Sequence, residues 1–216
     1  MAFKKKIKTF KQISSNISVD ENEDNLLYFS KLFNNVEYFI FFGTLLGITR
    51  EKGLIDGDDD IDFYVNLKDR SKLIDNLKNN NIEVDLKLSV NKNNYFLQVK
   101  RIVNDKVLIT DFYFYETDIE KNFIIERWNF EGGTNDTSKH LRTPKIFIFP
   151  LKKIFFKSCE ISIPKESELI CEFLYGINWK KKLKKDKEYK IKVINGKPYL
   201  FIVKKFLFFK RLLLSL

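Results

Sequence analysis

The run of aspartates between positions 56 and 62 constrains this chain more than any other feature of its sequence. Five of these seven residues are aspartate. Two carboxylates about 5 Å apart repel each other by roughly 3 kcal/mol at an effective dielectric constant near 20. A loop that keeps five of them is therefore either fully solvated or holds a cation.

The residues that follow the run favour the cation. Residues 60–66 read as a strand that enters a hydrophobic core. Because side chains alternate along a strand, Asp60 and Asp62 are expected on one face and Ile61 on the other. Two carboxylates on one strand face form half of a site for a hard cation such as Mg²⁺ or Mn²⁺. An acidic, solvated turn before a strand stays open as the alternative.

The spacing of the run excludes a helix–loop–helix calcium loop. Ile61 stands where that loop needs glycine, and Leu67 stands where it needs a bidentate glutamate. Within the run we prefer Asp58 to Asp59 as an additional outer contact of the cation, because strand alternation would turn Asp59 away from Asp60.

A second group of candidate residues lies just upstream, at Gly43 and Thr44. They follow an apolar segment at residues 36–42 and precede a short helix predicted at residues 45–50. The nearly continuous apolar character of residues 36–42 predicts a central strand. Backbone N–H groups at a helix N-terminus bind phosphate readily, so we predict that Gly43 and Thr44 bind a phosphate.

A third carboxylate, Asp111, lies in the middle of an apolar strand predicted at residues 106–115. A carboxylate between apolar and aromatic neighbours is not expected to be buried without a partner. Asp111 therefore either faces solvent from an edge strand or belongs to a site.

Residues 43–62 resemble the signature of the LicD-type transferase family, which is related to the fukutin-related enzymes. The segment carries Gly-Thr-Leu-Leu-Gly, then Arg50, then an aspartate-rich turn that ends in Asp-Ile-Asp. The order of elements is also that of the wider nucleotidyltransferase fold. The match departs at residues 56–57, where the family usually has Pro-Trp, and this leaves open what replaces the contacts of that tryptophan.

A less specific similarity continues to residue 179. Phe-Pro-Leu at residues 149–151, Ile-Pro-Lys at residues 163–165 and Tyr-Gly-Ile-Asn-Trp at residues 175–179 stand in the order of the family's C-terminal landmarks. Many relatives have a proline shortly after the tryptophan, whereas three lysines follow it here. Between these landmarks we predict a strand and then a helix whose core face is Leu169, Ile170, Phe173 and Leu174.

The resemblance implies an α+β fold with a nucleotidyltransferase-like mixed sheet flanked by helices and a basic, apolar C-terminal extension. It also implies a phosphotransferase of the LicD type. Such enzymes move a phosphocholine or phospho-polyol group from a CDP-activated donor to a sugar hydroxyl of lipopolysaccharide, capsule or teichoic acid. Two other classes stay open, namely a nucleotidyltransferase that adds NMP to a small molecule, protein or RNA, and a non-enzymatic membrane-associated binding module.

The resemblance also implies roles for the candidate residues. Asp111 takes the position of the third carboxylate beside Asp60 and Asp62, and the three would bind Mg²⁺ or Mn²⁺ and act in catalysis. Asp111 is the candidate base. Gly43 and Thr44 would hold the donor phosphate. Arg50 would neutralise charge on the leaving nucleotide, or it is a solvated cation at a helix end.

Composition bounds the domain organisation. Of the 216 residues, 44% are hydrophobic and 22 are phenylalanine, which indicates a folded chain. We expect a basic lead-in at residues 1–19, a catalytic domain at residues 20–179 and a basic, apolar extension at residues 180–216. The pattern of the sequence also predicts a helix at residues 20–35, a half-exposed strand at residues 82–90 and a hairpin around Asn195 and Gly196. The least legible region, residues 116–145, contains His140, which could be a base, a phosphate contact or a surface residue.

The charge of the chain limits the kinds of partner that it can bind. The net charge of +10 around an acidic site suits anionic partners, namely nucleotides, phosphorylated glycans or an anionic membrane surface. The resemblance implies a CDP-activated donor and a glycan or glycolipid acceptor. Nucleic acid is not favoured, because the chain shows no aromatic–basic binding motif.

Cysteine usage and apolar stretches indicate the location. Cys159 and Cys171 form no CxxC pair, and the sequence shows neither a signal-like apolar stretch nor a membrane span, so we expect a cytoplasmic protein. Residues 199–216 are cationic and apolar, which suits peripheral contact with the inner face of a membrane, or packing in a core or oligomer.

Overall fold

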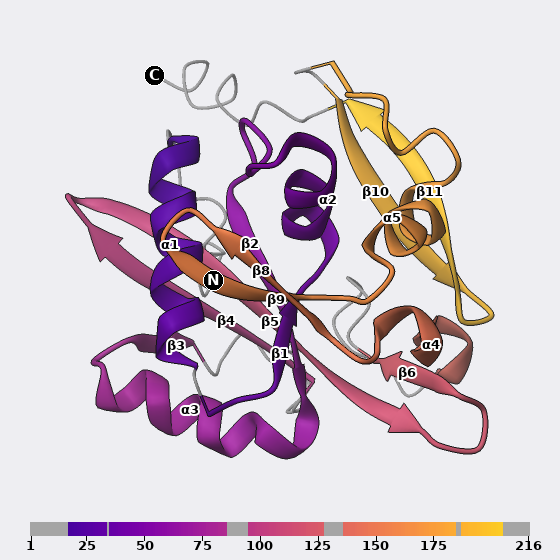
Figure 1. The fold of residues 1–216 in the computed structure, drawn as a ribbon, viewed down its shortest axis with the longest axis horizontal. Coiled ribbons are helices and arrows are strands. Elements are labelled where there is room, and N and C mark those ends of the chain that lie inside the picture. The colour runs from indigo at the N-terminus through magenta and orange to yellow at the C-terminus, as the bar shows by residue number, and fades with distance from the viewer. Residues whose placement is uncertain (1–16, 34, 86–94, 128–135, 185–186, 205–216) are drawn as a thin grey trace, which may run out of the picture.

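A computed structural model describes residues 17–33, 35–85, 95–127, 136–184 and 187–204. The main sheet has the strand order β1-β2-β5-β4-β3 (Figure 1). Strand β6 pairs with the C-terminal end of β5, and β7 pairs with β6. Among the strands described for this sheet, β2 and β5 form the one parallel pair. The expected mixed sheet flanked by helices is therefore confirmed. The strands of this sheet are β1 (Tyr38–Ile40), β2 (Asp60–Asn66), β3 (Glu83–Asp85), β4 (Phe96–Val103), β5 (Lys106–Asp118), β6 (Phe123–Glu126) and β7 (Leu141–Pro144).

The remaining elements are helices around the sheet and two separate hairpins. The helices are α1 (Val19–Leu32), α2 (Phe42–Glu51), α3 (Arg70–Asn79), α4 (Lys145–Ile148) and α5 (Ser167–Tyr175), with the 3₁₀ turns η2 (Leu67–Asp69) and η4 (Thr137–Lys139). The hairpins are β8 (Lys152–Phe156) with β9 (Cys159–Ile163), and β10 (Lys187–Ile194) with β11 (Lys197–Lys204).

One face of the main sheet is aromatic and is covered by α1. Phe63 of β2 and Phe112 of β5 stack with ring centroids 5.4 Å apart. Phe29 of α1 and Phe33, the residue that follows the helix, pack edge-on against Phe112 at 5.9 and 5.4 Å. A capping box between Ser18 and Glu21 begins α1 close to the predicted start of the helix. These contacts bury the aromatic face of the sheet beneath α1.

The opposite face of the sheet carries polar side chains close to α2. Strand alternation places Asp60, Asp62 and Tyr64 of β2 on this face. Phe42, the first residue of α2, lies 5.0 Å from the ring of Tyr113 and 5.5 Å from that of Tyr64. Helix α2 therefore begins directly beside the carboxylates.

The prediction of a central strand at residues 36–42 is wrong in two respects. The strand β1 spans only Tyr38–Ile40 and lies at the edge of the main sheet. All three of its residues are nevertheless buried, because β9 packs against it. Helix α2 also begins at Phe42 rather than at residue 45, so Gly43 and Thr44 lie inside its first turn.

The C-terminal hairpin predicted around Asn195 and Gly196 is confirmed. Both residues have positive φ angles, of 50° and 78°, as a tight two-residue turn requires. The backbone N–H of Gly196 donates to the carbonyl of Ser138 at 3.0 Å, and that of Arg142 donates to the carbonyl of Gly196 at 3.0 Å. The hairpin also contacts α5 and β7, so it is packed onto the rest of the fold.

The helix predicted after Pro164 is confirmed as α5, but its core face is narrower than expected. Ile170 and Leu174 are buried, whereas Leu169 is 44% exposed and Phe173 is only partly buried. Cys171 and Tyr175 complete the buried face instead.

Parts of some predictions lie outside the described residues. They are the lead-in up to residue 16, the strand after residue 85, residues 128–135 and the apolar segment from residue 205. Among the helices that the structure describes, none has the length and apolar character needed to cross a membrane.

Candidate functional site

The parallel pairing of β2 with β5 brings the three predicted carboxylates together. Asp62 and Asp111 are direct partners in the register, and Asp60 lies two residues before Asp62 on the same face. The side chains are buried, with 6%, 6% and 3% exposure for Asp60, Asp62 and Asp111. Since β5 lies between β2 and β4, the alternative of a surface-facing Asp111 on an edge strand is wrong.

Gly43 lies between Asp62 of β2 and Asp58 of the aspartate loop. Its backbone N–H donates to Asp62 Oδ2 at 3.1 Å. A Cβ at position 43 would lie 2.7 Å from Asp58 Oδ2 and 3.5 Å from Asp62 Oδ2. Only glycine leaves room for Asp58 to approach here, so Asp58 joins the cluster as a fourth carboxylate.

The prediction that Asp59 turns away from Asp60 is wrong. Carboxylate oxygens of Asp58, Asp59 and Asp60 lie within 4.8 Å of one another. The strand β2 begins only at Asp60, so strand alternation does not apply to the two residues before it. Both loop aspartates are therefore close enough to take part in cation binding.

Thr44 fixes the backbone of the same strand. Its Oγ1 accepts a hydrogen bond from the N–H of Asp62 at 2.8 Å, and the side chain is 1% exposed. Gly43 and Thr44 thus attach the first turn of α2 to Asp62. In this structure both groups are directed to Asp62, and their contact with a phosphate stays a prediction.

Helix α1 holds the aspartate loop from the other side. Asn22 Nδ2 donates to the carbonyl of Asp58 at 2.8 Å, and Glu23 Oε1 accepts from the N–H of Leu54 at 3.3 Å. Glu23 also forms an ion pair with Lys157 of the β8–β9 turn. The two α1 residues are buried, with 2% and 6% exposure, so the loop conformation depends on them.

These anchoring residues were not predicted from the sequence, although their spacing carries a signal. Asn22, Asn25, Leu26 and Phe29 follow the i, i+3, i+4, i+7 spacing of a buried helix face. Asn25 Nδ2 donates to Thr110 Oγ1 at 2.9 Å across the core. Polar residues on a buried helical face indicate contacts with another element rather than with water.

Electrostatics at the site are set by burial and by the carboxylates. Burial, followed by the negative charges of Asp111 and Asp62, raises the pKa of Tyr113 well above its ordinary value. Burial, followed by the charge of Glu126, raises the pKa of Tyr64 in the same way. Both phenols therefore stay protonated at neutral pH and cannot act as bases.

Glu126 and His140 are two further buried residues whose burial the sequence did not predict. Glu126, at the end of β6, is 1% exposed, and His140, before β7, is 4% exposed. The interpretation of His140 as a surface residue is therefore wrong. Roles as a base or as a phosphate contact stay open for it.

Lys100 places a cation on the same face of the sheet. It pairs with Ile109 of β5, which in turn pairs with Asp60 of β2. Arg101, the next residue, instead lies over the ring of Tyr28 of α1 at 4.0 Å, on the opposite face. Lys100 therefore lies in the row of Asp60 and next to the row of Asp62 and Asp111. A cation in this position suits an anionic substrate.

Arg50 lies at the opposite end of α2 from Gly43. Its guanidinium donates to Glu51 Oε1 at 2.7 Å, to the carbonyl of Trp179 at 3.3 Å and to the hydroxyl of Tyr189 at 3.4 Å. Its side chain is only 7% exposed, so the alternative of a solvated helix-end cation is wrong. These contacts connect α2 to the C-terminal hairpin.

Burial alone would raise the pKa of Glu51, but hydrogen bonds from Lys182 and Arg50 outweigh it and lower the pKa below its ordinary value. A depressed carboxyl pKa stabilises the fold above the unfolded-state pKa, and this stabilisation disappears as the pH falls through the folded-state value. The connection between α2 and the segment around Lys182 is therefore expected to weaken in acid.

Replacing Arg50 by methionine is expected to lower the free energy of unfolding by about 1–3 kcal/mol, because Glu51 and the carbonyl of Trp179 lose a buried donor. Urea unfolding at neutral pH measures this change. An unchanged unfolding midpoint together with a large loss of turnover would contradict the structural role and favour the predicted contact with the leaving nucleotide. Lys204→Met, which removes an exposed cation at the end of β11, is the control.

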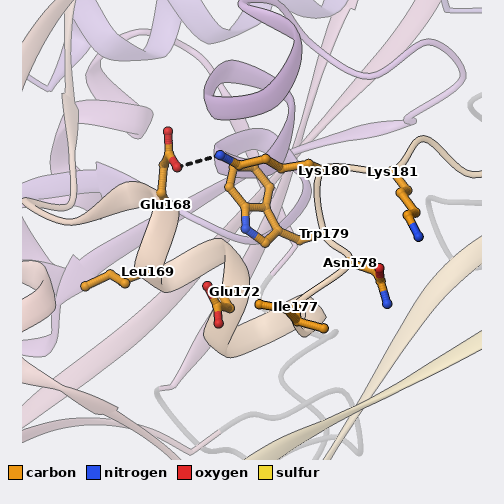
Figure 2. Close-up of a pocket in the computed structure, with 8 residues that line it drawn as sticks. All are labelled: Glu168, Leu169, Glu172, Ile177, Asn178, Trp179, Lys180 and Lys181. Carbon is orange, nitrogen blue, oxygen red and sulfur yellow. Dashed lines mark hydrogen bonds and ion pairs between the residues drawn. The ribbon is translucent and has the colours of Figure 1, made fainter.

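A hollow of about 320 Å³ lies away from the carboxylates, between α5 and the turn before Lys181 (Figure 2). Lys180 Nζ forms an ion pair with Glu168 Oε2 at 2.9 Å across it. None of the five aspartates described above (Asp58, Asp59, Asp60, Asp62 and Asp111) lines it, so it is not part of the candidate site. The lining residues are Glu168, Leu169, Glu172, Ile177, Asn178, Trp179, Lys180 and Lys181.

A mixed sheet with carboxylates from adjacent parallel strands on one face is the arrangement expected for a nucleotidyltransferase domain. Residues 35–166 match the family model described as LicD/FKTN/FKRP, nucleotidyltransferase domain. The chain belongs to this family, and the match includes Asp58, Asp60, Asp62 and Asp111. Membership indicates a transferase, and it confirms the resemblance found in residues 43–62.

The chain was also compared with solved structures and with curated proteins. The crystal structure of the lincosamide antibiotic adenylyltransferase LnuA with lincomycin bound is similar to this chain with a TM-score of 0.48 and 18% sequence identity. The similarity covers 71% of this chain and 86% of that chain. Among curated proteins, none matches this sequence.

Proposed function

We propose that this protein is a metal-dependent phosphotransferase. It would move a phosphocholine or phospho-polyol group from a CDP-activated donor to a sugar hydroxyl of a cell-surface glycan. The observation that carries the proposal is the register of β2 and β5, which sets Asp62 beside Asp111 with Asp60 on the same face. Membership of the LicD family supports the class of reaction.

The carboxylates fit a divalent cation by their chemistry. Asp60, Asp62 and Asp111 would hold Mg²⁺ or Mn²⁺, which prefer hard oxygen ligands, and Asp58 and Asp59 lie close enough to add outer contacts. A bound cation would also relieve the repulsion among these buried charges. When bound, it would supply charge stabilisation on the donor diphosphate.

The chain's own residues would orient the donor and the acceptor. Gly43 and Thr44 hold Asp62 at the N-terminus of α2, and this helix end would favour a phosphate placed beside it. Lys100 would contact an anionic group of the donor from β4. Asp111 stays the candidate base in this proposal, as the resemblance to the family implies.

The partners and the location follow from the same proposal. A glycan or glycolipid would be the acceptor, and nucleic acid would not be a partner. A basic chain with a net charge of +10 suits anionic substrates at the inner face of a membrane. Tyr199, Phe201 and Ile202 of β11 are 45–55% exposed, which would suit peripheral contact through the C-terminal region.

Thermal unfolding with a panel of ligands tests the proposal. We expect CDP-choline or a CDP-polyol to raise the melting temperature in the presence of Mg²⁺ or Mn²⁺ and not with EDTA. A ligand at 100 times its dissociation constant adds about 2.7 kcal/mol of stability, which such a measurement detects easily. ATP and UDP-sugars serve as controls that share the phosphate charge.

Other outcomes of the panel would contradict the proposal. A metal-dependent shift with nucleoside triphosphates would favour a nucleotidyltransferase, and the mass of the product would then show NMP on the acceptor. The description of the family as a nucleotidyltransferase domain makes this the second candidate. No shift with any ligand, with metal present, would favour a binding module without catalysis.

A further inference from the structure

Gln98, the residue of β4 that pairs with Asp111, has a buried amide side chain. Gln98 of β4 pairs directly with Asp111 of β5, which pairs with Asp62 of β2. The three side chains therefore lie in one row across adjacent strands, on the carboxylate face. Gln98 is 6% exposed, a low value for a residue type that is usually at the surface.

The amide makes a short contact with the carboxylate. Gln98 Nε2 donates to Asp111 Oδ1 at 2.6 Å, and both groups are buried. Only the NH₂ end of the amide can donate to a carboxylate, so the contact defines the orientation of Gln98 as well. Oδ1 of Asp111 is thereby held from β4.

The surroundings leave little freedom to this pair. Phe96, two residues before Gln98, packs against Tyr113 with ring centroids 5.1 Å apart. Asn25 of α1 holds Thr110, the neighbour of Asp111, by a hydrogen bond of 2.9 Å on the other face. Strand β5 is therefore fixed from both faces and by both neighbouring strands.

We propose that Gln98 is a positioning residue that fixes the side chain of Asp111 in the orientation needed to bind the divalent cation. The inference rests on the proposed function. Without the amide, the carboxylate of Asp111 would lose the contact that holds its Oδ1 from β4. Outer partners of metal ligands typically contribute about 10–100-fold to metal affinity.

The test measures Mn²⁺ binding to the full chain by isothermal titration calorimetry, without donor or acceptor. We expect Gln98→Leu to raise the Mn²⁺ dissociation constant by about 10–100-fold. Gln98→Asn keeps the amide but shortens the side chain by one methylene, so it is expected to weaken binding too. This second variant decides the question if Gln98→Leu does not fold.

Thr110→Val is the matched control. It removes one buried hydrogen bond from the residue next to Asp111, but on the face opposite to the carboxylates. It is expected to lower the free energy of unfolding, as Gln98→Leu does, and to leave the Mn²⁺ dissociation constant unchanged. A role of Gln98 in stability alone would affect unfolding in both variants and Mn²⁺ binding in neither.

Two results would overturn the inference while leaving the proposed function intact. One is a dissociation constant for Gln98→Leu and Gln98→Asn within about twofold of the wild-type value, where the expected change is tenfold or more. The other is an equal loss of affinity in Thr110→Val. A wild-type chain that binds no Mn²⁺ would overturn the inference together with the metal site itself.

Discussion

Replacing Asp60 or Asp62 by asparagine is expected to lower transfer activity at least about 100-fold, because each change removes a charge from the proposed cation site. The fold should tolerate both changes. The cluster of like charges loses a repulsive member, so the melting temperature without metal should stay the same or rise. An asparagine oxygen at position 62 can still accept the N–H of Gly43.

Turnover, the circular dichroism spectrum and the melting temperature with and without Mn²⁺ measure this prediction. The Mn²⁺-dependent rise in melting temperature should disappear in both variants. Asp75→Asn makes the same chemical change on the exposed side of α3 and should leave activity and metal response unchanged. Full turnover in both Asp60→Asn and Asp62→Asn would show that the carboxylates are not the catalytic site.

Replacing Gly47 by alanine is expected to lower the free energy of unfolding by about 2–3 kcal/mol. The added Cβ would lie 2.7 Å from the carbonyl oxygen of Gly53, 3.1 Å from the backbone nitrogen of Ile55 and 3.2 Å from Leu54 Cα. These are backbone atoms of the loop that leads to the aspartates, so they cannot move without shifting the site. The sign is diagnostic, because glycine to alanine inside a helix normally stabilises by about 1 kcal/mol.

Urea unfolding at 25 °C measures the loss, and Gly53→Ala provides a graded comparison. A Cβ at Gly53 would meet only Glu23 Oε1, the end of a side chain, at 3.1 Å. We therefore expect a smaller change for Gly53→Ala than for Gly47→Ala. A Gly47→Ala variant as stable as the wild type would mean that the loop does not pack against α2 as the structure shows.

The sequence predicted the carboxylate pair on β2 because its evidence is local. Alternation over residues 60–66 is a property of the strand itself, so Asp60 and Asp62 could be placed on one face without any partner strand. The same holds for the turn at Asn195 and Gly196, whose residue types favour positive φ angles. Both predictions needed only neighbouring residues.

Predictions that depended on the place of an element in the fold were less successful. The apolar run at residues 36–42 predicted burial correctly but not its cause, because β9 covers an edge strand as fully as a neighbouring strand would. For Arg50 the sequence left open a contact with the leaving nucleotide or a solvated position at a helix end. The chain instead returns more than a hundred residues later to place Trp179 and Tyr189 against it. Long-range contacts of this kind leave no periodic signal in the sequence.

The sequence by itself determined which residues could form a cation site, because closely spaced carboxylates repel unless water or a cation compensates them. Only the tertiary structure decided which of them meet. The parallel register sets Asp111 beside Asp62, Gln98 reaches Asp111 from β4, and Asn22 with Glu23 holds the loop from α1. Strands β2 and β5 pair in parallel and are joined by a long crossover rather than a tight turn, so no short turn between them specifies which residues meet.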